Sequence, residues 1–239
     1  MRTFGIILNS MIVTLFTHTA CRKNLACESG NNQLTKQELV LPTFERIEVS
    51  GSMYVYLRED SVQKVEVELE SNLVGDLNKS VTNGKWRIDF DKCVNERKRV
   101  NVFISMPRLK EIRLDGSGEV TSQTDFHGGD LVVQLNGSGK IDLSTFYSNI
   151  LVSTNGSGNV ALKGKSSSLN ATISGSGEQH LFGLTSDEGN VEINGSGEME
   201  LNISKSLIAK ISGSGKVRYK GLPTVSSSID GSGSVENIQ

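Results

Sequence analysis

Apolar and polar residues alternate along most of this chain, and the tripeptide Gly-Ser-Gly interrupts the alternation at regular intervals. Successive copies are 18 to 21 residues apart, and they begin at positions 116, 137, 156, 175, 195, 213 and 231. Alternation is the period of a strand that buries one face. A repeat of this length is typical of a β-solenoid, in which each repeat forms one coil that stacks on the coil before it.

The apolar positions predict the course of each coil. Ile112 and Leu114 precede the first tripeptide, and Ile141 and Leu143 follow the second, as comparable pairs do around most other copies. Each coil is therefore predicted as a strand, a sharp bend at the tripeptide, a second strand and a looser return segment. Gln179 stands where its counterparts are Val, Ile or Met. A polar side chain at a core position needs a hydrogen-bond partner or a gap in the packing.

The tripeptides themselves are predicted to be structural turns. The residue before each one is Asp, Asn or Ser, whose side-chain oxygen can bond the backbone two residues further on. Glycine allows positive φ angles and lets neighbouring coils approach without a Cβ. Gly-Ser runs are usually flexible linkers, but the apolar alternation on both sides excludes that interpretation here. The turn glycines are Gly116, Gly118, Gly137, Gly139, Gly156, Gly158, Gly175, Gly177, Gly195, Gly197, Gly213, Gly215, Gly231 and Gly233.

The chain before the first tripeptide is rich in predicted strands but less regular. Ser50–Ser52 resembles a degenerate copy of the tripeptide, and Asn83-Gly84 predicts a tight turn into a strand. We expect one all-β domain over residues 41–239. Its irregular half covers residues 41–110 and caps one end of the stack, and its repeat coils cover residues 111–239.

The N-terminus predicts export. Residues 1–20 combine an early arginine, a short apolar stretch and small residues, as a signal peptide does. The sequence Thr-His-Thr-Ala-Cys resembles a bacterial lipobox, so Cys21 is the predicted lipidation site, with ordinary secretion as the alternative. The polar residues 21–40 are predicted to be a flexible tether. In an oxidising compartment Cys27 and Cys93 could pair, but the sequence leaves this open.

Composition narrows the classes of partner. The net charge is −2, and no basic stripe with interleaved aromatic residues is present, which argues against nucleic acid. No Cys/His spacing predicts a zinc site, and no cofactor is expected. Aromatic residues make up only 5% of the chain. In the repeats the candidates for stacking on sugars are Phe146, Tyr147, Phe182 and Tyr219, whereas His127 and Asp130 flank two glycines and are assigned to a loop.

One cluster of ionisable residues is predicted from the repeat spacing. Outward positions of adjacent coils lie about 4.8 Å apart, so four side chains should form one surface patch. They are Glu178, His180, Glu198 and Glu200. These residue types suit metal binding or acid–base chemistry. Lys216 and Arg218 follow on the next coil, however, and cross-strand salt bridges are the preferred interpretation.

The combination of two motifs is similar to a known family. Phe44-Glu-Arg-Ile-Glu-Val-Ser-Gly-Ser, followed by repeated Asn/Ser-Gly-Ser-Gly, resembles the head GIN domain family of auto-transporter adhesins, exported proteins of Bacteroidetes. The resemblance covers residues 41–239 and implies a right-handed parallel β-helix. It supplies no catalytic residues.

These observations predict a non-enzymatic lipoprotein of the cell envelope. We expect it in the outer membrane, facing either the periplasm or the exterior, with adhesin-like binding of a glycan or protein ligand. The alternative is a β-helix enzyme that acts on an envelope polysaccharide, which would need carboxylates converging in a groove across the coils.

Overall fold

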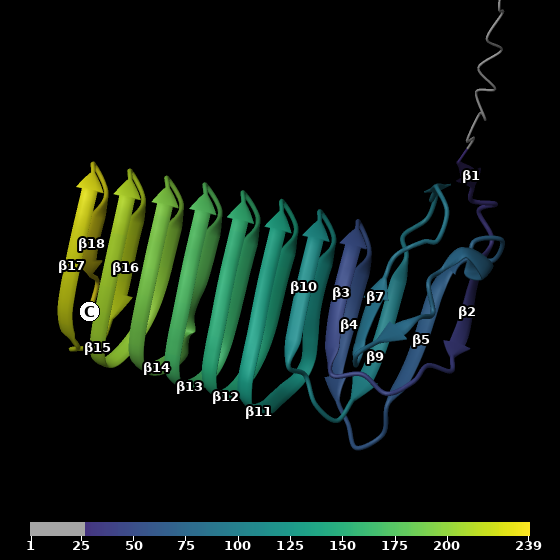
Figure 1. The fold of residues 1–239 in the computed structure, drawn as a ribbon, viewed down its shortest axis with the longest axis horizontal. Coiled ribbons are helices and arrows are strands. Elements are labelled where there is room, and N and C mark those ends of the chain that lie inside the picture. The colour runs from purple at the N-terminus through teal and green to yellow at the C-terminus, as the bar shows by residue number, and fades with distance from the viewer. Residues whose placement is uncertain (1–26) are drawn as a thin grey trace, which may run out of the picture.

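A computed structural model describes residues 27–239, which form a β-solenoid of about seven coils. In Figure 1 the coils lie side by side along the long axis, from the irregular N-terminal part to the C-terminus. The described residues contain no α-helix and one short 3₁₀-helix, η1 (Val74–Asp76). The prediction of an all-β solenoid is confirmed.

The repeat coils are long strands that pair in parallel with their neighbours. They are β10 (Glu111–Gly116), β11 (Glu119–Gly137), β12 (Lys140–Gly156), β13 (Asn159–Gly175), β14 (Glu178–Gly195), β15 (Glu198–Gly213), β16 (Lys216–Lys220), β17 (Thr224–Gly231) and β18 (Ser234–Asn237). The prediction of a looser return segment is wrong. β12 and β13 stay paired around the corner, for example at Phe146 and Lys165, because in-register hydrogen bonds continue through the bend.

The turn glycines lie directly over one another. Gly116, Gly137 and Gly156 pair across adjacent coils. Gly156 has φ +118°, and a Cβ there would lie 2.6 Å from the carbonyl oxygen of Gly137. Only glycine tolerates both the positive φ and this approach. The tripeptides are therefore corners of the coil, as the sequence predicts.

Three of the residues that precede the tripeptides form hydrogen bonds that differ from the sequence expectation. Asn136 donates to Asp115 Oδ1 at 2.6 Å, and Asn155 donates to Asn136 Oδ1 at 2.8 Å. At these three positions the side chains bond one another across coils, rather than the local backbone. The turn backbone is instead satisfied by the preceding coil, since the N–H groups of Ser138 and Gly139 both donate to the carbonyl of Gly116.

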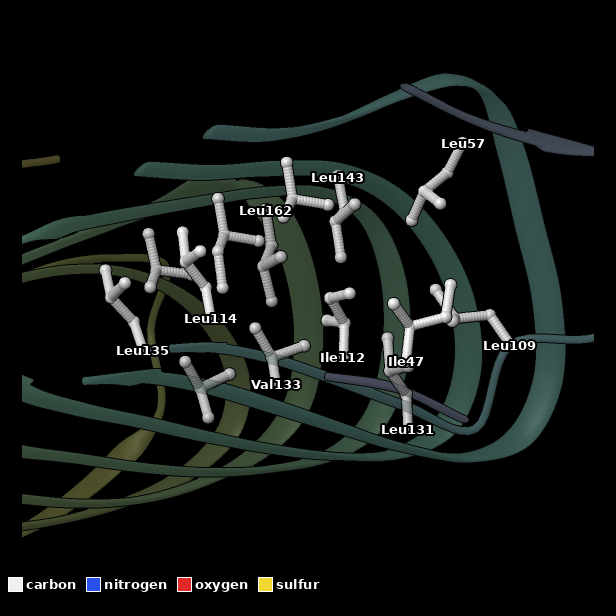
Figure 2. Close-up of a cluster of buried hydrophobic side chains, with 14 of the residues drawn as sticks. Ile47, Leu57, Leu109, Ile112, Leu114, Leu131, Val133, Leu135, Leu143 and Leu162 are labelled. Carbon is white, nitrogen blue, oxygen red and sulfur yellow. The ribbon is translucent and has the colours of Figure 1, made fainter. Parts of the chain in front are cut away.

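The core is a column of apolar side chains between the two runs of the coils. Figure 2 shows members of this column, including Ile112, Val133 and Leu143, pointing into the enclosed space. All three are completely buried. Gln179 is also completely buried, and its Nε2 donates to Thr154 Oγ1 at 3.0 Å and to the carbonyl of Thr172 at 2.9 Å. The hydrogen-bond partners expected from the sequence are therefore present.

The N-terminal half extends the same sheet and adds antiparallel strands. Its strands are β1 (Glu28–Ser29), β2 (Leu34–Leu39), β3 (Arg46–Gly51), β4 (Tyr54–Glu59), β5 (Lys64–Glu70), β6 (Val81–Thr82), β7 (Lys85–Ile88), β8 (Val94–Asn95) and β9 (Asn101–Met106). β3 pairs in parallel with β10, and Gly51 aligns with Gly116, so the degenerate tripeptide is a true turn. β4 pairs with β9 and β11, and β5 runs antiparallel to β9.

The prediction of a flexible tether over residues 21–40 is wrong where the structure describes it, since Glu28–Ser29 already form β1. Cys21 and the signal peptide over residues 1–20 lie outside the described residues, but residues 34–39 form β2, antiparallel to β5. The tether prediction is wrong for this stretch. Strand addition satisfies backbone groups whatever the side chains are, and Leu39 is buried where the strand ends. Cys27 is bonded to Cys93, which ties the start of the described chain to the loop before β8.

Candidate functional site

The patch predicted from the repeat spacing forms as expected on β14 and β15. Glu178 aligns with Glu198, and His180 aligns with Glu200, while Arg218 of β16 is the next residue in the second row. The stacked coils thus bring together side chains that are 18 to 22 residues apart in the sequence. This placement follows directly from the parallel register.

The ionisable groups of the patch are bonded to one another. His180 Nδ1 lies 2.9 Å from a carboxylate oxygen of Glu200, and His180 Nε2 lies 3.1 Å from Glu178. Arg218 contacts both Glu198 and Glu200, the latter at 2.8 Å. Exposed ion pairs of this kind contribute about 0–1 kcal/mol each. Within residues 27–239 no group of acidic, His and Cys side chains has the geometry to hold a metal ion.

A second site lies at the corner where the irregular half meets the repeats, and the sequence did not predict it. A cavity of about 600 Å³ opens here. Its walls come from β3, the linker between β9 and β10, the start of β10, and the corners of β11 and β12. The lining residues are Arg46, Arg108, Leu109, Lys110, Glu111, His127, Gly128, Gly129, Asp130, Val132 and Tyr147.

The cavity exists because the first repeat coil is incomplete. β11 pairs with β4 only over residues 119–122 and with β10 only over residues 132–137. Between these ranges the corner of β11 has a strand partner on one side alone, which is β12. The chain enters β10 through residues 107–110 instead of through a corner strand. The missing corner leaves the open space.

Tyr147 forms the floor of the cavity and holds the linker. Its hydroxyl donates to the carbonyl oxygen of Leu109 at 2.6 Å, and its side chain is buried. Burial raises the pKa of the Tyr147 hydroxyl well above its ordinary value, with the nearby carboxylate of Glu59 adding to the rise. The ring lies against Gly128, where a Cβ would come within 2.4 Å of Tyr147 Cε1. Glycine at 128 therefore makes room for this ring.

The rim of the cavity is aromatic on one side. The rings of His127 and Phe146 stack, with centroids 5.3 Å apart and planes inclined by 16°. Glu59 fixes His127, because its carboxylate accepts the backbone N–H of His127 at 2.6 Å and lies 3.1 Å from Nδ1. Phe146 is 40% exposed, so this stacked pair presents an open aromatic surface next to the cavity.

The charges on the wall are mostly positive. Lys110 pairs with Glu45 at 2.5 Å, but Arg46 and Arg108 pair with no carboxylate of residues 27–239. Arg46 donates instead to the carbonyl oxygen of Asn83. Of the two wall carboxylates, Glu111 is paired with Lys85 at 2.6 Å. Among residues 27–239 the wall therefore has two guanidinium groups that form no ion pair, and one carboxylate, that of Asp130, that forms none either.

Some signals for this site are visible in the sequence. The assignment of His127 and Asp130 to a loop is wrong, because both lie in β11, which stays paired with β12 around the corner. Phe146 and Tyr147 appear in the sequence only as separate aromatic residues. The spacing between the first two tripeptides is also the longest, and the two additional residues lie in a bulge at residues 122–124, just before the corner. Nothing in the sequence joined these features, since their proximity depends on how the chain enters β10.

Comparison with known proteins finds one matching family model and solved bacterial structures of the same fold. Residues 43–223 match the family model described as putative auto-transporter adhesin, head GIN domain. The comparison with curated proteins gave no match. No helix in the described part of the chain has the length and hydrophobicity needed to cross a bilayer.

Three solved structures share the fold. A putative adhesin from Bacteroides fragilis has 23% identity and a TM-score of 0.83, over 88% of this chain and 99% of its own. A putative adhesin from Parabacteroides merdae has 23% identity and a TM-score of 0.73, over 88% and 98%. A putative lipid binding protein from Parabacteroides distasonis has 24% identity and a TM-score of 0.71, over 88% and 99%.

Proposed function

Because the chain belongs to the head GIN domain family, described as putative auto-transporter adhesin, we propose that it is a non-enzymatic, lipid-anchored envelope protein that binds a surface or matrix ligand. The corner cavity is the observation that carries this proposal. It offers a preformed recess of about 600 Å³, within the range of about 300–1,000 Å³ typical of ligand sites.

The solenoid is suited to holding such a site rigid. Its repeat strands pair in parallel from coil to coil on the C-terminal side of the cavity, and its apolar core runs from the N-terminal half into the repeats. A recess built on this frame keeps its shape without a bound ligand, which lowers the entropic cost of binding. The solved neighbours named as adhesins or as a lipid binding protein are consistent with a binding role.

The ionisable patch gives weaker support to an enzyme. A glycosidase needs one carboxylic acid and one carboxylate placed on either side of a bound sugar. In the patch the carboxylates of Glu198 and Glu200 are engaged by Arg218, and His180 bridges Glu178 and Glu200. These contacts hold the side chains against the sheet surface.

The binding role can be tested with purified protein on an array of glycans and matrix proteins. We expect saturable binding to at least one component, and no binding by protein unfolded in urea. Binding to no component would refute the adhesin-like role. Time-dependent release of sugar ends from the glycans would instead establish enzymatic turnover.

The anchor needs a separate test, since it rests on the lipobox-like sequence before Cys21. We expect the wild-type protein in the membrane fraction of the producing cell. The Cys21→Ser variant should lose that association and appear in the soluble fraction. Unchanged membrane association of this variant would refute the lipid anchor.

A further inference from the structure

We propose that the corner cavity binds an acidic saccharide, with the acid group against Arg108 and Arg46 and the sugar ring against the aromatic rim. This inference rests on the proposed binding function and assigns it a site and a ligand class.

The cations select an anion. Arg46 and Arg108 line the cavity without a carboxylate partner among residues 27–239, and Lys110 lies beside them. Guanidinium groups bind carboxylate, sulfate and phosphate oxygens through two parallel hydrogen bonds, and such charge-assisted bonds are about twice as strong as neutral ones. An acid group on the ligand would pair with the two guanidinium groups that form no ion pair within residues 27–239.

The carboxylates of the wall select a ligand that donates hydrogen bonds. Asp130 accepts from Asn149 Nδ2 at 2.7 Å, which leaves its other oxygen free to accept a ligand hydroxyl. Glu111 also faces the cavity. An alkyl chain packed against these two groups would remove water from charged oxygens without replacing its hydrogen bonds, which is costly. A sugar supplies hydroxyl donors at these positions, so the wall favours a saccharide over a fatty acid.

The rim completes a sugar site. The stacked rings of His127 and Phe146 and the buried ring of Tyr147 all border the corner. A second, shallower recess next to the cavity shares Gly128 and Tyr147 with it and continues towards Lys165 and Ser167. The two recesses form one surface around the Tyr147 ring. A ligand of more than one sugar unit can therefore extend from the cavity onto the outer face of β12.

The test uses a disaccharide of glucuronic acid and N-acetylglucosamine, and the same disaccharide with glucose in place of the acid. Calorimetric titration of the wild-type protein should show binding of the acidic sugar and at least tenfold weaker binding of the neutral one. Failure of the acidic sugar to bind at millimolar concentration, or equal binding of the two sugars, overturns the inference.

Variants locate the site. Arg108→Gln removes one of the two guanidinium groups and should weaken binding at least tenfold. Lys110→Gln should also weaken it, whereas Lys210→Gln, the same change on an exposed lysine of β15, should not. The double change of Arg108 and Lys110 to Gln removes two of the three cations that line the cavity and should weaken binding more than either single change. Unaltered melting temperatures show that these variants fold.

The outcomes separate the two proposals. If the wild-type protein binds components of the glycan and matrix array, and Arg108→Gln and Lys110→Gln bind them equally well, the cavity proposal is wrong and the binding function stands. If the acidic disaccharide binds in the cavity but no array component binds, the saccharide site stands and the adhesin-like function is wrong.

Discussion

The buried amide of Gln179 allows a sharp test of how polar groups are tolerated in this core. Gln179 lies between Val160 and Met199 in the stack of inward positions. Its Nε2 donates two hydrogen bonds, one of them to Thr154 Oγ1, but its Oε1 accepts none from the described residues. The core thus contains one satisfied donor group and one unsatisfied acceptor on the same side chain.

The expected changes in stability follow from these hydrogen bonds. A buried acceptor without a partner costs about 1–3 kcal/mol, and each ordinary hydrogen bond contributes about 0.5–1.5 kcal/mol. Thr154→Val removes an acceptor and leaves the amide worse satisfied, so it should destabilise the fold by about 1 kcal/mol. Gln179→Met removes the unsatisfied oxygen and both hydrogen bonds, so it should change stability by less than about 1 kcal/mol. The double variant removes every polar group of the pair and should be about 1–2 kcal/mol more stable than the wild type.

Urea unfolding of the four proteins measures this coupling. Circular dichroism follows the sheet, and fluorescence follows the single tryptophan, Trp86, in the N-terminal half. Coincident transitions are needed, because repeat proteins can unfold in parts. Additive effects of Gln179→Met and Thr154→Val, or a double variant less stable than the wild type, would contradict the reasoning.

Three further predictions concern the stability of the β-solenoid. Gly156→Ala forces a Cβ to within 2.6 Å of a backbone oxygen at φ +118°, and should lower the free energy of unfolding by about 3 kcal/mol or more. The control Gly75→Ala, where a Cβ meets no atom within 4 Å, should change the free energy of unfolding little. Cys93→Ser removes the disulfide to Cys27, whose two cysteines are 66 positions apart. The loss of loop-closure entropy should lower the free energy of unfolding by about 4 kcal/mol, measured by thermal or urea unfolding. Burial raises the pKa of Glu70, but backbone N–H groups of Arg97, Asn32 and Lys98 outweigh burial and lower it below its ordinary value. Ionised Glu70 therefore stabilises the fold above its unfolded pKa, and this stability is lost as pH falls through the lower folded pKa. In a series from pH 7 to pH 3, the free energy of unfolding should fall less steeply for Glu70→Gln than for the wild type.

Each of these predictions has a clear contrary result. Equal stability of Gly156→Ala and Gly75→Ala would show that the turn column is not tightly stacked. An unchanged midpoint for Cys93→Ser would show that the N-terminal strands hold without the disulfide. An identical pH profile for Glu70→Gln would show that the carboxylate contributes no pH-dependent stability.

The amino-acid sequence determined the repeat architecture because the information there is local and periodic. Alternating apolar residues specify strands with one buried face, and the spacing of Gly-Ser-Gly specifies one coil. If the coils pair in parallel and in register, the residue beside any outward residue is the one at the equivalent position of the next coil. This is why the patch of Glu178, His180, Glu198 and Glu200 could be placed from the sequence, together with its pairing to Arg218.

Only the tertiary structure decided what happens where the repeat breaks. The polar residues 34–39 form a strand because β5 offers a free edge for backbone pairing, which side-chain pattern does not reveal. The pairing of Cys27 with Cys93 depends on that same placement. The cavity exists because residues 107–110 enter β10 without a corner strand. Arg108 and Tyr147 therefore line the same cavity because of the topology and not because of their spacing in the sequence. A periodic sequence specifies the contacts between equivalent positions, but the contacts at an interruption depend on the path of the whole chain.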